Sequence, residues 1–221
     1  KVKAIQLDVD KGADLDTAWY DYFSSHEDIS DAQVRDAVRI LTEDFNKLNG
    51  DTADVVSPFK NSIGNPEITF ALATKDPYGN CTNGIVRHYD PKTDWSSSFS
   101  NYKYTWPANR DLNIYVVRKI GSGAAGYTYL PGAGIPASAD AIVILASYVG
   151  SIGTGNHGTS RALTHEVGHW LNLPHTWGGT NQPGVSCGDD GVSDTPITKG
   201  FTSCNLSNAS ICNPGIVENM Q

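Results

Sequence analysis

Three histidines and one glutamate in a short run restrict how this chain can fold. In His165-Glu166-Val167-Gly168-His169 the two histidines stand four positions apart, so on an α-helix both imidazoles project from one face. His175 lies six positions beyond His169, too far along the chain to share that face. If the three side chains act together, the helix ends soon after His169 and the chain turns back sharply.

The residues before His175 suit such a turn. Asn172 tolerates the left-handed backbone conformation that ends helices, and Pro174 cannot continue a helix. Neutral imidazole is a preferred ligand of Zn²⁺, and a catalytic zinc site has three protein ligands and one open position for water. The spacing therefore predicts a sharp helix end followed by a third zinc ligand.

Glu166 separates a catalytic interpretation from a structural one. It stands one position after His165, offset from the metal axis, where its carboxylate can reach a water rather than the ion. A purely structural zinc site has no use for that carboxylate, yet a non-catalytic surface-binding protein with such a site stays as the alternative. A zinc peptidase of the thermolysin type, whose third ligand is a distant Glu, is disfavoured by the position of His175.

Hydrophobic spacing outlines the elements that surround this run. Apolar residues at helical spacing predict a helix from Asp31, with Gly50 as its stop. Strands are predicted over 68–73, 112–117 and 141–146, the last of them buried, and Tyr127 and Tyr129 alternate like a short edge strand. The first thirty residues are polar and rich in Asp, and no strand is predicted there. A second helix is predicted at about 159–171.

The run HEVGHWLNLPHTWGG, followed by GDDGVSDTP, resembles the metzincin zinc signature HExxHxxGxxH and, more narrowly, the pappalysin family of the ulilysin and mirolysin type. The match is tight from about Arg161 to Pro196, with Asn172 where the family usually has Gly. The resemblance implies a secreted zinc-dependent endopeptidase of protein or peptide substrates. His165, His169 and His175 would be its zinc ligands and Glu166 its general base, and related pappalysins prefer a basic residue just after the cut.

The resemblance also implies an α+β, metzincin-like fold. We expect an N-terminal catalytic subdomain over 1–175, with a mixed twisted sheet, a backing helix and the active-site helix. An irregular, disulfide-bonded C-terminal subdomain would occupy 176–221, with the zinc in the cleft between the two. Acidic and hydroxyl side chains crowd a Gly-containing loop, and hard oxygen ligands suit Ca²⁺, which enzymes of this type carry near this loop. The calcium ligands expected from this are Asp190, Ser193, Asp194 and Thr195, although a solvated acidic turn would have the same composition.

The end of the sequence departs from the family pattern. Metzincins have a methionine turn beneath the zinc, and the one methionine here, Met220, lacks the Asp-Tyr that follows it in pappalysins. Either Met220 is the turn methionine or the chain stops just before the turn. The second interpretation is favoured, and part of the substrate pocket is then either missing from this chain or carried by a separate C-terminal fragment left by proteolytic cleavage. By the same resemblance Cys187 pairs with Cys212, Cys204 pairs beyond residue 221 and Cys81 stays free.

Composition narrows the classes of partner. The formal net charge of −8 argues against a nucleic-acid partner, because proteins bind nucleic acid through basic surfaces that displace counterions. No apolar run reaches the length of about 18–20 residues that crosses a bilayer. Cysteines gathered in a polar, loop-like stretch favour disulfides, and hence an oxidising, extracellular setting.

Overall fold

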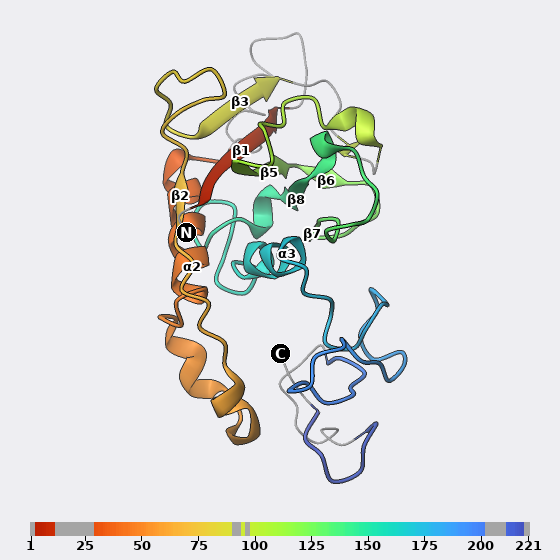
Figure 1. The fold of residues 1–221 in the computed structure, drawn as a ribbon. Helices are drawn as coiled ribbons and strands as arrows, with labels where there is room; N and C mark the ends of the chain where they lie inside the picture. Colours follow the sequence, from red (N-terminus) through yellow and green to blue (C-terminus); the bar gives the residue numbers. More distant parts are fainter. Residues whose placement is uncertain (1–2, 12–28, 90–93, 96–97, 202–210, 219–221) are drawn as a thin grey trace. The chain divides into compact units, whose positions relative to one another are not determined.

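The computed structural model describes residues 3–11, 29–89, 94–95, 98–201 and 211–218 (Figure 1). The chain divides into two compact units. The first, here called the sheet unit, comprises Lys1–Asn49 and Asn65–Leu171, and the second, the C-terminal unit, comprises Gly50–Gly64 and Asn172–Gln221. By compactness the segment 50–64 groups with the C-terminal unit, and the expected subdomains over 1–175 and 176–221 stay a prediction.

A mixed sheet forms the sheet unit, in the strand order β2-β1-β5-β8-β7, and β3 also pairs with β1. The strands pair in parallel except for β7, which runs antiparallel to β8 at the end of the sheet. Short β4 and β6 form a separate pair. The strand bounds are β1 Lys3–Lys11, β2 Phe70–Leu72, β3 Ile85–Tyr89, β4 Asp94–Trp95, β5 Asp111–Val117, β6 Lys119–Ile120, β7 Gly126–Tyr127 and β8 Ala141–Leu145.

The central strand β1 was not expected from the sequence. Its residues Ile5, Leu7 and Val9 alternate with polar ones, which is the period-two pattern of a strand. The surrounding Asp-rich composition hid that pattern. Because β1 pairs with β2, β3 and β5, it holds three strands in one sheet.

Successive side chains of β5 and β8 point to opposite faces of the sheet, and both faces are buried. On one face Leu112, Ile114 and Ile142 pack in a core cluster with residues of two helices, α2 (Asp31–Asp44) and α3 (Ala162–Trp170). On the other face Tyr115 and Val143 pack in a second cluster. Both strands are therefore buried on both sides, as is typical of parallel sheets.

Helix α2, Asp31–Asp44, covers the first of these faces (Figure 1). Ser30 caps its N-terminus, because the Ser30 hydroxyl accepts a hydrogen bond from the Gln33 amide at 3.1 Å. The helix ends before the expected stop at Gly50. Four short 3₁₀ helices lie at Gly50–Asp54, Ser57–Ser62, Phe99–Asn101 and Ala137–Ala139, and a fifth lies at Ala146–Tyr148.

The buried side chain of Gln33 fastens α2 to the connection that leads from β8 to α3. Its amide nitrogen donates to the carbonyls of Ala146 (3.1 Å) and Val149 (2.9 Å) and to the hydroxyl of Thr154 (2.8 Å). A Cβ on Gly153 would lie 2.2 Å from the Gln33 side-chain oxygen, so this position needs glycine for space as well as for its φ of +67°. The connection before α3 is thereby held in one conformation.

Asp36 makes a second tie between the same two segments. Its carboxylate accepts hydrogen bonds from the Ser151 amide (2.6 Å) and hydroxyl (2.8 Å) and pairs with Arg39 at 2.6 Å. Partial burial raises the pKa of Asp36, but the bonds from Ser151 and Arg39 outweigh it and hold the pKa below the usual 3.8. The ionised form therefore stabilises the folded state.

Asp36→Asn is expected to lower the free energy of unfolding by about 1–2 kcal/mol at neutral pH. Because the folded-state pKa lies below the unfolded one, this contribution is full above the unfolded pKa and disappears as pH falls through the folded value. Urea unfolding of both proteins from pH 7 down to about pH 2.5, well below the ordinary carboxyl pKa, measures the difference. A deficit that stays constant over that range would show that the ionised carboxylate is not the source.

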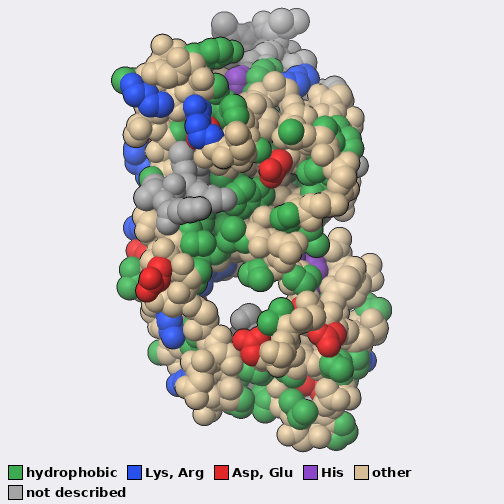
Figure 2. Space-filling view, in the orientation of Figure 1, with side chains coloured by type: hydrophobic (Ala, Val, Ile, Leu, Met, Phe, Trp, Pro, Cys, Tyr) green, Lys and Arg blue, Asp and Glu red, His purple; other side chains and the backbone are tan. Residues whose placement is uncertain are grey.

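Figure 2 presents one face of the surface, coloured by the type of side chain. Charged side chains of both signs are dispersed there among polar and apolar ones, without a continuous basic stripe among the described residues. In the part of the chain that the structure describes, no helix has the length and apolarity to cross a bilayer.

Candidate active site

Helix α3, Ala162–Trp170, carries the first two histidines of the motif. Their Nε2 atoms lie 3.0 Å apart, and their rings meet edge to face with centroids 4.5 Å apart. His165 and His169 thus share one helix face, as their spacing predicts. Asn172 follows the C-cap residue Leu171 and has a φ of +76°, the left-handed conformation that the sequence predicts for it.

His175 stands on the stretch that follows this turn. Its ring stacks on that of Trp177, with centroids 4.4 Å apart and planes within 6°, and its carbonyl accepts from the Gly178 amide at 2.9 Å. One ligand atom from each of His165, His169 and His175 lies within 4.8 Å of the others. Three neutral imidazoles so close together are a donor set that fits Zn²⁺.

Glu166 is the buried acid of α3, with 7% of its surface exposed. Burial raises its pKa to about 7, because desolvation disfavours the charged form. A carboxyl group with a pKa near neutrality can both accept and release a proton at physiological pH. That property suits a general base that later acts as an acid.

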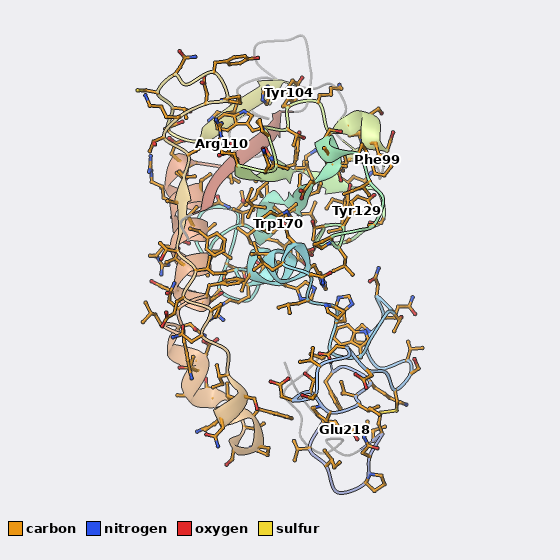
Figure 3. The ribbon with its side chains drawn as sticks, in the orientation of Figure 1. Phe99, Tyr104, Arg110, Tyr129, Trp170 and Glu218 are labelled. Carbon is orange, nitrogen blue, oxygen red and sulfur yellow. A yellow bond between two sulfur atoms is a disulfide. The ribbon has the colours of Figure 1, made fainter. Side chains whose placement is uncertain are left out.

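Two side chains outside the motif anchor α3. At its start Asp44 accepts a hydrogen bond from the Thr164 hydroxyl (2.6 Å) and pairs with Arg161 (3.2 Å). At its end Trp170 donates to Asp140 at 2.7 Å (Figure 3). Sequence reasoning missed both Asp44 and Asp140, because each contact joins residues that are far apart in the chain and no local motif signals it.

Asp44→Ala is expected to lower the free energy of unfolding by about 1–3 kcal/mol, because it removes a buried acceptor with 5% side-chain exposure. Arg161, at 44% exposure, remains solvated and moderates the loss. The matched control is Glu43→Ala, one position earlier, where a more exposed helical ion pair with Arg39 contributes under about 0.5 kcal/mol. Chemical denaturation would contradict the anchoring role if the two variants lost equal stability.

Strand β7 lies beside α3 at the end of the sheet, and its Tyr127 is fixed from two sides. The Tyr127 hydroxyl accepts from the Trp95 indole at 2.8 Å and from the Tyr102 hydroxyl at 3.1 Å. Burial raises the pKa of Tyr127, so its hydroxyl stays protonated. Just beyond the strand, Tyr129 contacts Phe99 with ring centroids 5.9 Å apart (Figure 3).

The C-terminal unit is held by a disulfide between Cys187 and Cys212, the pair that the resemblance implied. The buried Glu218 accepts hydrogen bonds from the backbone amides of Cys212 (2.9 Å) and Asn213 (Figure 3). Cys81 is exposed and outside any disulfide. Met220 and Cys204, for which the sequence raised hypotheses, lie outside the described residues.

In the acidic loop of this unit, the first two carboxylates accept hydrogen bonds from backbone amides of the same loop. Asp189 accepts from the Gly191 amide at 2.7 Å and Asp190 from the Val192 amide at 3.0 Å. Ser193 and Asp194 are exposed and Thr195 is half-buried. Among the described residues the acids of this loop do not form a metal-binding group like that of the histidines.

Known proteins resemble this chain in sequence and in fold. The family model described as pregnancy-associated plasma protein-A, peptidase family M43, matches residues 96–221. An extracellular metalloprotease of Colletotrichum graminicola is 40% identical over 111 residues, which are 48% of this chain and 38% of that protein. One of Podospora anserina is 34% identical over 120 residues, 50% of this chain and 39% of that protein. The matched part thus spans about two fifths of these relatives.

Among solved structures, mature mirolysin of Tannerella forsythia in complex with a cleaved peptide superimposes with a TM-score of 0.84. The two are 32% identical, and the match covers 99% of this chain and 80% of that one. The similarity confirms the expected metzincin-like α+β fold. Since the family model covers more than half of the sequence and includes the whole histidine motif, the chain belongs to the pappalysin peptidases of family M43.

Proposed function

We propose that this protein is a zinc-dependent endopeptidase that hydrolyses peptide bonds in proteins or peptides. The observation that carries the proposal is the grouping of His165, His169 and His175, together with the buried Glu166 on the helix that carries the first two of them. Three protein ligands leave an open position, which distinguishes a catalytic zinc site from a closed structural one. Membership of a metallopeptidase family supports the same activity.

In this proposal the three histidines hold the ion, and Glu166 moves the proton. Bound zinc would supply Lewis acidity for a water molecule and for the scissile carbonyl. Glu166 takes the proton from the attacking water and then delivers it to the leaving amine nitrogen. Its raised pKa near 7 suits both transfers.

The substrate backbone would add to β7, the last strand of the sheet. Addition of an extended peptide to a sheet edge supplies main-chain hydrogen bonds without demanding a particular sequence. The alternation of Tyr127 and Tyr129 predicts a short edge strand here, and β7 spans Gly126–Tyr127. Adjacent α3 would bring Glu166 to the same edge.

Secretion, cleavage specificity, calcium binding and the completeness of the pocket are proposed largely from the similarity to the family. Secretion is supported by the names of the extracellular relatives and by the disulfide of the C-terminal unit. Cleavage before a basic residue, calcium at Asp190, Ser193, Asp194 and Thr195, and a separate C-terminal fragment that completes the pocket are further predictions.

Digestion of an unstructured protein tests the proposal directly. The purified chain is used as isolated, after zinc removal by a chelator, and after zinc is restored, with metal content measured and cut sites read by mass spectrometry. We expect one zinc per chain, loss of cleavage on chelation, and recovery with zinc. Bound zinc without cleavage would instead support the structural-zinc, surface-binding alternative, and the cut sites would show whether a basic residue follows the bond.

A further inference from the structure

The general base of the proposed mechanism touches the backbone of β7 at a glycine. A Cβ placed on Gly126 would lie 3.2 Å from Cγ and 3.3 Å from Oε1 of Glu166. Both separations are shorter than ordinary van der Waals contact between a methyl group and a side chain. Gly126 has no left-handed φ, so the reason for glycine here is close approach and not backbone conformation.

Strand β7 cannot easily move away from Glu166 to make room for a side chain. The same Cβ would also lie 3.0 Å from the Val143 carbonyl oxygen, so the backbone of β8 limits the space at this position as well. The Ala125 carbonyl accepts from the Leu145 amide at 2.9 Å, and Tyr127 is held by its hydrogen-bonded hydroxyl. The strand is thus fixed on both sides of Gly126.

Of the groups that meet at Gly126, the Glu166 side chain can change its conformation more easily than the backbone of β7 or β8. Its carboxylate ends a side chain with three rotatable bonds, whereas the neighbours in β8 are backbone atoms. Rotation of the side chain would relieve the contact and carry the carboxylate away from its present position. The helix backbone that bears His165 and His169 need not move.

We infer that Gly126 is a positioning residue for Glu166: the bare backbone of β7 forms the wall against which the general base is set. The inference rests on the proposed function for its catalytic consequence, but the contact itself belongs to the sheet unit alone. One strand would then both receive the substrate backbone and hold the group that activates water. A side chain at 126 would uncouple proton transfer from zinc binding.

The test compares Gly126→Ala with Gly121→Ala, whose Cβ would meet, among the described residues, only the Trp95 carbonyl at an ordinary 3.6 Å. For Gly126→Ala we expect kcat to fall about 10- to 100-fold, the cost of a misplacement of about 1 Å, with KM and zinc affinity changed less than about twofold. Gly121→Ala should behave like wild type. Peptide hydrolysis gives kcat and KM, and competition with a chromophoric chelator gives zinc affinity.

Glu166→Asp distinguishes positioning from general damage to the fold. Its shorter side chain escapes the added methyl group, so Glu166→Asp should cost several-fold less in kcat in the Gly126→Ala background than in wild type. Equal costs in the two backgrounds, or an unchanged kcat in Gly126→Ala, would overturn the inference. So would a loss of zinc affinity in parallel with kcat.

A crystal structure of Gly126→Ala decides the same question without activity. We expect the Glu166 carboxylate to have rotated away from β7 relative to wild type, with His165 and His169 in place. An unmoved carboxylate would refute the positioning role. If the wild-type chain bound zinc but cleaved nothing, the proposed function would fail while this structural result still stood for or against the contact.

Discussion

Glu166→Gln is expected to lower kcat/KM by about a thousandfold while zinc stays bound. Glutamine keeps the size and burial of the side chain, but its amide cannot take a proton from water. General acid–base groups contribute about 10²–10⁴-fold to rate, and Glu166 would serve in both proton transfers. Since the three histidines are untouched, zinc affinity should change little.

The measurement is peptide hydrolysis by zinc-loaded wild type and variant, with metal content determined on the same samples. Glu67→Gln makes the same chemical change at an exposed position outside α3 and should leave kcat/KM unaltered. Full activity of Glu166→Gln would remove Glu166 from the mechanism. Loss of zinc together with activity would make it a metal-site residue instead.

The second large effect is expected on the affinity for zinc. His169→Ala should weaken zinc binding by more than about 100-fold, because even residues that only support metal ligands cost 10–100-fold when replaced. His169 lies 3.0 Å from its partner nitrogen on His165, so its loss leaves one imidazole on the helix face. The affinity of a two-ligand remnant falls accordingly.

Chelator competition at fixed pH gives the zinc dissociation constants. The matched variant is His157→Ala, which removes an exposed histidine in the loop before α3 and should bind zinc like wild type. Zinc should also raise the thermal unfolding temperature of wild type but not of His169→Ala, since only a protein that binds the ion is stabilised by it. Equal affinities in all three proteins would place the zinc elsewhere.

Local sequence patterns predicted the helix that carries His165 and His169 and several elements around it. The 3.6-residue spacing gave helices that the structure places at Asp31–Asp44 and Ala162–Trp170, and apolar runs gave β5 and β8. Asn172 marked the end of α3, because few other residues accept a positive φ. These features depend on residues that are close in the sequence, so local patterns are enough to predict them.

The features that were missed depend on residues far apart in the chain. Strand β1 is stabilised by parallel pairing with distant strands, and its own composition is polar. Asp44 acquires its role only when α2 meets the start of α3. Gly126 looks like one more glycine in a Gly-rich stretch until the sheet brings it against Glu166.

The central place of β1 has a consequence for biosynthesis. Strand β1 leaves the ribosome well before its partners, because β3 and β5 come much later in the sequence. At synthesis rates of about 5–20 residues per second, β1 waits on the order of 10 s before the sheet can close around it. Asp8 and Asp10 alternate with its apolar residues, and such charges discourage an unpaired strand from joining another chain. The acidic pattern that disguises β1 as a loop in the sequence would thus protect the nascent chain from aggregation until β5 is made.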